Sequence, residues 1–459
     1  MRIELAYSRR RAEIEVPDSN LVAVIRPEWP AVLARPQASV ADALRRPAAG
    51  RRHGEVYPPG RAGPPLAEVL RQRAGPRDRS ANPDIRTSVW SNFKAVLLVS
   101  DLTRPCPNHD ILAPILAELR QGGIPPECVT ILIATGLHAP VTGKQTERLL
   151  GADIVAACRV VNHFGHRGVT LKRLGRTEAG TPVVLSREWV GADLRIATGV
   201  IEPHLMAGFS GGRKAVCPGI AGAETVMAWH SPKFLEQERV RPGRLDGNPE
   251  HAEALAVADF APPHFIVNVT VDREGGMTGV FAGQMRAAHE AGVEFLRRHI
   301  ERPVPEPCDI LVTTSGGRPL DATFYGAEKG LLTGLPILKA GGTFLWAAAC
   351  EDGLGGPEFT DLVMRYRTLD EFRKAVTAEG AAVTKDQWAL ENLAKAARHA
   401  EILFWSDALP PETQQRLFVT PVRSLEEGLR RAFEKHGPAA RVVVSPQGPY
   451  VLPYVKNSN

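Results

Sequence analysis

The chain has 459 residues, of which 44% are hydrophobic and 23% are charged, and its formal net charge is +5. This length exceeds one ordinary hydrophobic core and predicts two or three domains. Basic residues are spread along the chain and aromatic residues make up only 6%, which does not indicate a nucleic-acid-binding surface. The mild basicity favours small anionic ligands instead.

Neither a membrane span nor a secretory signal is expected. The longest apolar runs have strand length, whereas a membrane helix requires roughly 20 apolar residues. Residues 1–6 lack a basic stretch followed by an apolar run. The six cysteines show no Cys-x-x-Cys spacing, so their scatter favours a reducing compartment over a disulfide scaffold or a thiolate zinc site. We therefore expect a cytoplasmic protein.

The first part of the chain predicts little regular structure. Residues 21–25 have the pattern of a strand. The stretch 26–84, rich in Pro, Arg and Ala, predicts two short helices at 40–44 and 65–72, joined by loops. We interpret this stretch as a connector that covers the surface.

From residue 94 onward, apolar segments of strand length alternate with segments of helix length. Such alternation predicts α/β domains with mainly parallel sheets, which bind ligands at the carboxyl ends of their strands. The expected strands lie at residues 94–100, 129–134, around 160, 181–185, 194–200, 309–314, 342–348, 400–405 and 441–445. The expected helices lie at residues 110–121, 143–150, 286–299, 327–340 and 369–378, with a further helix from Glu224.

A proline-rich joint at residues 301–307 is the best candidate for a domain boundary. It divides the chain into an N-terminal α/β domain at 1–300 and a C-terminal α/β domain at 307–444. We expect residues 445–459 to pack back on the first domain. The active site is expected in the cleft between the two domains.

Two motifs that directly follow predicted strands carry polar side chains. Asp101, Thr103 and Arg104 follow the first strand after residue 94, and the planar guanidinium of Arg104 suits a carboxylate or a phosphate. His138 follows the next strand and would point into the crevice at the strand ends. Each motif alone is as compatible with a structural turn or a packed histidine as with a functional site.

The densest stretch of the chain is 199–222, which follows a strand and contains six glycines. Within it, the run Ser210–Lys214 offers backbone N–H groups, a hydroxyl and two cations, a combination that suits a phosphate. Its spacing differs from that of a Walker A loop. Lys214 would either contact a phosphate or carry a covalent attachment, and His204 precedes it by ten residues.

Three weaker candidates lie further along the chain. His230, sixteen residues after Lys214, is a candidate metal ligand through a neutral imidazole nitrogen. Tyr325 and Lys329 lie one helical turn apart after a strand and a glycine turn, and Trp388 offers an aromatic wall. Each of them alone is as compatible with a structural role as with a functional one.

Together these motifs resemble those of the nickel-pincer-dependent lactate racemase family, whose members racemise or epimerise 2-hydroxy acids. The resemblance extends in the same order from about residue 94 to residue 388. Its most specific part is the run Glu-Pro-His, Phe-Ser-Gly-Gly-x-Lys and Pro-Gly-Ile-Ala-Gly, followed by His230. It implies an isomerase that receives its cofactor from separate biosynthetic enzymes and acts on a small 2-hydroxy acid, with neither nucleic acid nor membrane as a partner. A homo-oligomer is compatible with it.

The cofactor of the family is a pyridinium-3,5-bisthiocarboxylic acid mononucleotide that holds nickel. The resemblance implies that Lys214 carries it covalently and that His230 is the protein's nickel ligand, since sulfur donors and imidazole in a square plane suit nickel. Within the N-terminal domain, the other residues expected to contact the cofactor are Ser210, Gly211, Gly212, Asp101 and Thr103. The resemblance also supplies two catalytic histidines and four substrate-binding residues, namely His138 and His204, and Arg104, Tyr325, Lys329 and Trp388.

The implied reaction is proton-coupled hydride transfer to and from the tethered cofactor. The C2 hydrogen of a 2-hydroxy acid is difficult to remove as a proton, because the carboxylate already carries negative charge. Removal as hydride is easier when a base takes the hydroxyl proton at the same time. Inversion therefore needs two acid–base groups, one on each side of the substrate, and histidines meet this need near neutral pH.

One residue departs from the pattern of lactate-specific members, in which glutamine follows the tyrosine that matches Tyr325. Gly326 stands at that position here. This difference predicts a roomier pocket and a different or bulkier 2-hydroxy acid.

The residues alone leave two alternatives open. A hydrolase or lyase would use zinc held by His138, His204 and His230, although this leaves Lys214 unexplained. A non-catalytic nickel- or nucleotide-binding protein would need only Lys214 and His230. A nicotinamide dehydrogenase is disfavoured, because no Gly-x-Gly-x-x-Gly fingerprint opens a helix.

Overall fold

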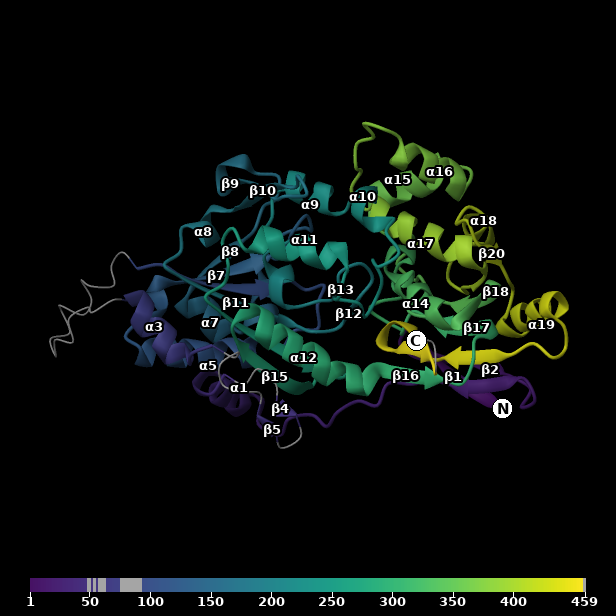
Figure 1. Cartoon of the computed structure of the whole chain (residues 1–459), viewed down its shortest axis with the longest axis horizontal. Coiled ribbons are helices and arrows are strands. Elements are labelled where there is room, and N and C mark those ends of the chain that lie inside the picture. Colours follow the sequence, from purple (N-terminus) through teal and green to yellow (C-terminus); the bar gives the residue numbers. More distant parts are fainter. Residues whose placement is uncertain (48–50, 53–54, 57–62, 75–92, 457–459) are drawn as a thin grey trace.

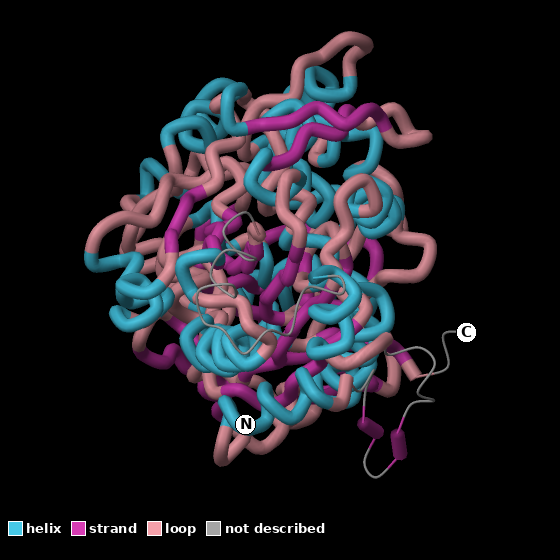
Figure 2. Tube along the Cα trace, turned by 90° about the vertical axis from the view of Figure 1, so that its left-hand side faces the viewer, coloured by secondary structure: helices cyan, strands magenta, loops and turns pink. Residues whose placement is uncertain are grey.

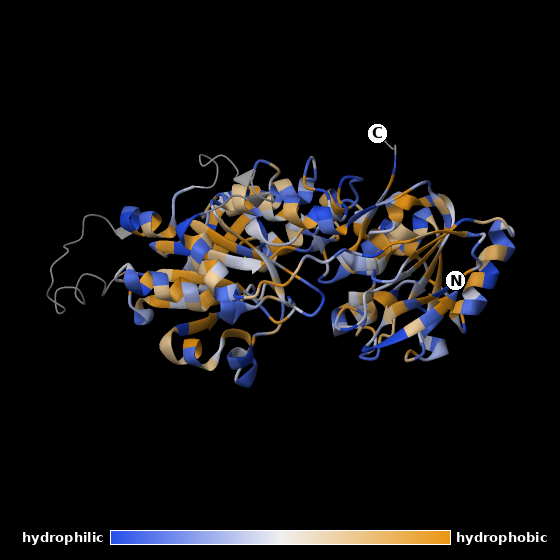
Figure 3. Ribbon diagram, turned by 90° about the horizontal axis from the view of Figure 1, so that it is seen from below, coloured by the Kyte–Doolittle hydropathy of each residue, from blue (hydrophilic) through white to orange (hydrophobic). Residues whose placement is uncertain are grey.

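Two six-stranded sheets organise the computed structural model, one in each half of Figure 1. The structure describes residues 1–47, 51–52, 55–56, 63–74 and 93–456. Strands run through the interior with helices around them (Figure 2), and apolar residues concentrate on the strands and on the inner sides of the helices (Figure 3). The predicted fold class, α/β with two mainly parallel sheets, is confirmed.

The first sheet has the strand order β15-β14-β11-β6-β7-β8. Its neighbours are parallel except for β14 and β15. The strands are β6 (Ala95–Ser100), β7 (Val129–Ala134), β8 (Arg159–Asn162), β11 (Leu194–Val200), β14 (Phe265–Val271) and β15 (Met277–Gly283). The central strands are nearly continuous runs of buried apolar residues, as a sheet covered on both faces requires.

Helices cover both faces of this sheet. In α5 (Asn108–Gln121), the apolar residues Ile111, Ile115 and Leu119 recur at helical spacing and are buried against one face. That face is also covered by α1 (Pro36–Arg45) and α3 (Leu66–Ala74). The opposite face is covered by α9 (Ala223–Trp229), α11 (Pro249–Ala258) and α12 (Met285–Ile300).

The second sheet has the order β20-β19-β18-β17-β21-β3, and all of its neighbours are parallel. The strands are β3 (Leu21–Val24), β17 (Cys308–Thr314), β18 (Leu338–Ala347), β19 (Glu401–Trp405), β20 (Thr420–Pro421) and β21 (Val442–Ser445). One face packs against α15 (Pro357–Arg365), α16 (Leu369–Thr377) and α17 (Gln387–His399). The other face packs against β1 (Arg2–Tyr7), β2 (Arg10–Glu15) and α19 (Leu425–His436).

The N-terminal strands belong to the second unit, in contrast to the predicted first domain at 1–300: β3 joins the second sheet, and β1 and β2 form a separate two-stranded sheet that packs on it. Strand β3 pairs with β21, and the purple β1–β2 hairpin lies beside β17 in Figure 1. Tyr7 stacks on Trp405 with ring centroids 4.6 Å apart. Because the partners are about 400 residues apart in the chain, no local sequence pattern records this pairing.

The C-terminal end returns toward the first sheet. Strand β22 (Leu452–Val455) pairs in parallel with β16 (Glu301–Val304), which occupies part of the predicted proline-rich joint. Leu452 packs in a buried cluster with Ile201 and Phe209 from the first half. The two ends of the chain therefore help to connect the two units.

The helix predicted at 327–340 is wrong. The structure breaks this stretch into α13 (Phe324–Ala327), α14 (Lys329–Leu332) and a 3-10 turn η4 (Leu335–Ile337), after which β18 begins. At Gly330, an added Cβ would lie 2.2 Å from the carbonyl oxygen of Thr314, so the backbone approaches β17 too closely for a side chain. Sequence analysis also missed β14 and β15 altogether.

The remaining elements are short. In the first half they are β4 (Arg51–Arg52), β5 (Glu55–Val56), η1 (Pro126–Cys128), α6 (Lys144–Leu150), α7 (Ala152–Ala157), η2 (Gly168–Thr170), β9 (Leu171–Arg176), β10 (Pro182–Ser186), α8 (Arg187–Val190), β12 (Pro203–His204), β13 (Gly208–Phe209), η3 (Gly212–Ala215) and α10 (Pro232–Leu235). In the second half they are α18 (Pro411–Gln414) and η5 (Gly448–Tyr450). The two helices predicted within 26–84 correspond to α1 and α3, and much of the rest of that stretch lies outside the described residues. Within the described ranges, no helix has the length and apolarity needed to cross a bilayer.

Candidate active site

A cavity of about 260 Å³ lies between the two units, at the carboxyl ends of β6, β7 and β11. Its walls combine strand-end loops of the first unit with residues from α13, α14 and α17 of the second. All predicted site residues except Gly212 line it, namely His138, His204, Lys214, Ser210, Gly211, Asp101, Thr103, Arg104, Tyr325, Lys329, Trp388 and His230. The structure thus brings together residues that are almost 290 positions apart.

His138 is held by the carboxylate of Asp101. The Nδ1 atom lies 2.7 Å from Oδ2 of Asp101, and the two donors of Thr103, its backbone N–H and its Oγ1, reach Oδ1 at 3.1 and 2.6 Å. Burial alone would raise the pKa of Asp101, but the hydrogen bonds from His138 and Thr103 outweigh it and leave this pKa lowered. Because an ionised carboxylate only accepts, Nδ1 carries the ring proton and Nε2 is left as a base.

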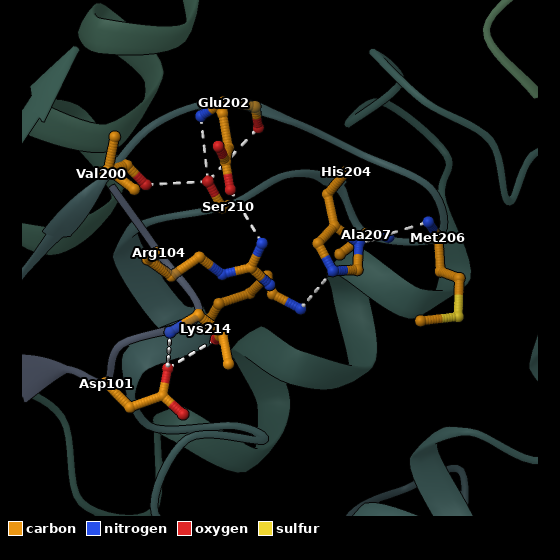
Figure 4. A network of polar contacts seen from close by, with 10 residues as sticks. Asp101, Arg104, Val200, Glu202, His204, Met206, Ala207, Ser210 and Lys214 are labelled. Carbon is orange, nitrogen blue, oxygen red and sulfur yellow. Dashed lines mark hydrogen bonds and ion pairs between the residues drawn. The ribbon is translucent and has the colours of Figure 1, made fainter. Parts of the chain in front are cut away.

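His204 and Lys214 face each other at the glycine-rich turn (Figure 4). Nζ of Lys214 lies 3.0 Å from Nε2 of His204, while Nδ1 of the same ring accepts the backbone N–H groups of Met206 and Ala207 at 3.3 and 3.2 Å. A neutral ring whose Nδ1 accepts has its proton on Nε2, so Nε2–H donates to the amine of Lys214. An amine accepts a hydrogen bond only when it is unprotonated.

The electrostatics of this pair agree with that assignment. Burial, reinforced by the nearby guanidinium groups of Arg104 and Arg213, holds the pKa of Lys214 well below its usual range. Burial and the cations Lys214 and Arg104 likewise hold the pKa of His204 well below its usual value. Both shifts favour the uncharged forms of the amine and of the imidazole, in agreement with the hydrogen-bond assignment.

The glycine-rich turn uses most of its polar groups internally. Oγ of Ser210 donates to the carbonyl of Val200 at 2.8 Å and accepts the backbone N–H of Glu202 at 2.9 Å. Gly212 has a φ of +53°, and its N–H donates to Oδ1 of Asn268 at 2.8 Å. An added Cβ at Gly212 would lie 2.8 Å from the ring of His289, on the side away from the cavity. Gly212 therefore shapes the turn, and its N–H is not directed at a ligand as the cradle prediction assumed.

His230 presents a bare nitrogen to the cavity. Its Nδ1 lies 2.9 Å from the carbonyl of Val226, which only accepts, so Nδ1 carries the proton and Nε2 keeps its lone pair. Burial lowers the pKa of His230 to about 3. The ring stacks on Trp388 with centroids 4.1 Å apart, and Nε1 of Trp388 donates to the hydroxyl of Tyr325 at 3.0 Å. The second unit thus covers this histidine with an aromatic wall.

Two cations mark one end of the cavity. Nη1 of Arg104 donates to Oε1 of Glu202 at 2.8 Å, and the rest of its guanidinium faces the cavity. Burial and the charge of Arg104 lower the pKa of Lys329, whereas Glu202 partly opposes this shift. The sequence analysis did not single out Glu202, although it stands in the Glu-Pro-His motif as the acid before His204. It also missed Asp386 and Glu328, which line the cavity and follow no recognisable pattern.

The zinc alternative lacks a ligand cluster. In the part of the chain that the structure describes, no group of three or more His, Cys, Asp or Glu side chains is placed to hold a metal ion. His138, His204 and His230 instead have three different partners, as described above. This finding does not apply to a metal ion that is bound by a single protein side chain.

The interpretation of Gly326 as added pocket space is wrong. Gly326 does not line the cavity. An added Cβ would lie 2.6 Å from the backbone carbonyl oxygen of Leu320, so a side chain here requires a different path of the 317–326 turn. The glycine reflects local backbone packing.

Comparisons with known proteins agree with the motifs. The family models for the lactate racemase N-terminal domain and C-terminal domain match residues 77–243 and 304–452. The chain is 35% identical over 354 residues to the lactate racemase of Lactiplantibacillus plantarum, with 77% of this chain and 83% of the relative covered. It is 33% identical over 358 residues to the lactate racemase of Thermoanaerobacterium thermosaccharolyticum, with 78% and 84% covered. A solved apoprotein structure of the lactate racemase from that second organism covers 100% of both chains with a TM-score of 0.85 and 28% identity. The family predicted from the motifs is confirmed: the chain belongs to the lactate racemase family and is an isomerase.

Proposed function

We propose that the protein interconverts the two enantiomers of a 2-hydroxy acid with a nickel pincer nucleotide tethered to Lys214. The observation that carries this proposal is the geometry of the site. Nζ of Lys214, which lies 3.0 Å from Nε2 of His204, and the bare Nε2 of His230 both face one cavity. The first is the nucleophile needed for a covalent tether, and the second is the form of imidazole that binds a metal.

The residues fit the group in number and chemistry. A cofactor that brings two sulfurs and a ring carbon to nickel needs one protein ligand, and His230 offers one imidazole nitrogen of fixed tautomer. When bound, such a cofactor supplies a site that accepts the C2 hydrogen of the substrate as hydride and returns it. The contacts predicted for Asp101, Thr103, Ser210 and Gly211 stay predictions.

The chain's own residues hold the substrate and move its hydroxyl proton. Arg104 and Lys329 offer two cations to the substrate carboxylate at one end of the cavity. His138, with Nδ1–H held by Asp101, accepts the hydroxyl proton at Nε2, and the carboxylate stabilises the imidazolium that forms. His204 offers an N–H donor from the other wall.

Tethering would also change the surroundings of His204. An amine converted into a thioamide nitrogen loses its basic lone pair and its ability to become charged. Nε2 of His204 then loses the partner that lies 3.0 Å away. A tethered nitrogen also cannot become charged, so Lys214 no longer contributes to the lowered pKa of His204, a shift whose largest cause is burial. Loading would therefore free His204 for the substrate.

Mass spectrometry of the intact protein tests the proposal. Protein produced together with the cofactor-building enzymes should exceed the mass of the bare chain by the nucleotide, and Lys214→Ala should abolish the increment. The loaded protein should interconvert enantiomers of a 2-hydroxy acid, measured by chiral chromatography, and the protein produced alone should not. Metal without added covalent mass would indicate the zinc hydrolase or lyase instead. Added mass without interconversion of any acid in a broad panel would indicate a non-catalytic carrier.

A further inference from the structure

A second cavity of about 200 Å³ adjoins the active site, and we call it the adjoining chamber. The two cavities share Thr103, Arg104, His204, Leu205 and Lys329 as walls. The chamber therefore begins where the substrate carboxylate and one of the two catalytic histidines are placed by the proposed function.

The walls of the adjoining chamber are mainly apolar. Trp29 and Tyr450 meet edge to face with ring centroids 5.7 Å apart, and Leu102, Pro319 and Leu320 line other sides. Leu102 is 49% exposed, so its side chain is accessible to a ligand in the chamber. The chamber thus offers aromatic and aliphatic surface directly beside the reacting groups.

Charges around the chamber are largely compensated. Arg104 is paired with Glu202, and Arg318 is paired with Glu351 and Asp352 at 3.2 and 2.8 Å. Asp272 and Arg273, which also line it, carry opposite charges on adjacent residues. This balance disfavours a second anionic group on the substrate and favours an uncharged one.

The chamber is larger than a methyl group requires. One water molecule occupies roughly 10–15 Å³ of such space, so a chamber of about 200 Å³ has room for a ring or a branched chain. The methyl group of lactate would leave most of it empty.

Stereochemistry decides which substrate form reaches the chamber. We assume that the C2 hydrogen leaves and returns on the same side of the substrate and that the carboxylate stays on Arg104 and Lys329. Inversion at C2 then exchanges the positions of the two remaining groups, the hydroxyl and the C3 substituent. The enantiomer whose hydroxyl faces His138 therefore directs its substituent toward His204, and the other enantiomer does the reverse. His204 lines both cavities, whereas His138 lines only the first.

We propose that the adjoining chamber binds an uncharged C3 substituent of the 2-hydroxy acid, either an aromatic ring or a branched chain. We call it a one-sided subsite because it lies on the His204 side of the substrate only, and this inference rests on the proposed function. It binds the substituent of only one enantiomer. Two free enantiomers have equal free energies, so kcat/KM must be equal in the two directions. A one-sided subsite consequently lowers both KM and kcat for the enantiomer that fills it, by the same factor.

Steady-state kinetics of the loaded enzyme with both enantiomers of lactate and of 2-hydroxy-3-phenylpropanoate test this. For the phenyl acid, we expect KM values that differ between enantiomers by roughly 3- to 10-fold, as expected for packing of one aromatic ring. For lactate, we expect less than about a 2-fold difference. Calorimetric titration of the protein without cofactor provides a readout independent of turnover and should show the same enantiomer preference.

Two variants and a control assign the effect to the chamber. Trp29→Ala should bring the two KM values for the phenyl acid together, and Leu320→Trp should raise the KM of the preferred enantiomer by filling the space. Phe260→Ala, an exposed aromatic residue outside both cavities, should change neither. Leu320→Trp keeps the proposal testable if Trp29→Ala does not fold.

The outcomes separate this inference from the proposed function. Racemisation of lactate with equal KM values for the phenyl enantiomers, unchanged by both variants, would overturn the subsite and leave the racemase standing. If the enzyme preferred a 2-hydroxy acid with a second carboxylate over the phenyl acid, the prediction that the C3 substituent is uncharged would be wrong. Failure to interconvert any 2-hydroxy acid would overturn the proposed function itself.

Discussion

Replacing Asp101 by asparagine should impair the enzyme more than removing the side chain altogether. In the wild type, the two donors of Thr103 reach Oδ1 and the ring of His138 reaches Oδ2. In Asp101→Asn, the donors of Thr103 select the amide oxygen, so the amide NH2 faces Nδ1 of His138. Because NH2 only donates, the ring must present a bare Nδ1 and move its proton to Nε2. That tautomer cannot accept the hydroxyl proton.

The magnitude follows from the contacts. A hydrogen bond to a charged group contributes roughly 1.5–3 kcal/mol, so the wrong tautomer lowers the population of the base by about 10- to 100-fold. Loss of the negative charge beside the imidazolium adds to this. We expect kcat to fall by roughly 10²–10⁴-fold, the usual contribution of a general base, with KM little changed. In Asp101→Ala the ring is free to adopt either tautomer, and the loss should be smaller.

Chiral chromatography of the loaded variants, starting from each enantiomer, measures kcat and KM in both directions. Covalent mass and nickel content are measured on the same samples, so that kcat is compared per loaded enzyme and a loss of cofactor is separated from a loss of the base. The tautomer argument would be refuted if kcat of Asp101→Asn were within about 3-fold of the wild-type value, or if kcat of Asp101→Ala were lower than that of Asp101→Asn.

The lowered pKa of Asp101 predicts a pH dependence of the free energy of unfolding as well. Its contribution to stability is present above the unfolded pKa of about 3.9 and is lost as the pH falls through the folded value.

Three further predictions concern the cofactor end of the site. Lys214→Met should raise the melting temperature at pH 7 by about 1 °C per kcal/mol gained for a chain of this length. Because burial lowers the pKa of Lys214, the wild type gains stability as the pH rises toward the unfolded value of about 10.4, and the variant does not. Equal melting curves from pH 6 to 9 would contradict this. His230→Ala should keep the covalent mass but lose nickel, as measured by elemental analysis. Trp388→Ala should expose His230 and raise its pKa from about 3, so that nickel is released on dialysis at pH 5.5 but not at 7.5, whereas Trp388→Phe should retain it.

Much of the site could be predicted from the sequence because parallel strands end at one edge of a sheet. Asp101 and His138 follow neighbouring strands β6 and β7, and the structure places them 2.7 Å apart. The glycine-rich turn after β11 brings Lys214 to the same edge. Local pattern and sheet topology predicted where these residues lie, whereas their roles came from the family resemblance.

Other features depend on contacts that leave no local pattern. Strand β3 joins the second sheet through β21, and Gly330 of the short helix α14 packs closely on the backbone of β17. The side chain of a residue at 326 was expected to point into the pocket, but the turn directs it at Leu320. The adjoining chamber is formed by many segments that are distant in the chain, including the connector at Trp29. Such features require the folded structure.

The three histidines of the site show how one side chain acquires three functions from its backbone surroundings. A carboxylate at Nδ1 makes Nε2 of His138 a base, a carbonyl at Nδ1 leaves Nε2 of His230 to a metal, and two backbone N–H groups at Nδ1 place the proton of His204 on Nε2. At rest, the two catalytic rings therefore offer opposite functions, an acceptor at His138 and a donor at His204. This asymmetry suits an acid whose hydroxyl faces His138 and whose C3 substituent enters the adjoining chamber beside His204. Because kcat/KM is the same in both directions, the two enantiomers should react at equal rates at limiting concentration, and the asymmetry should appear at saturation as a lower KM and a lower kcat for the enantiomer whose substituent enters the chamber.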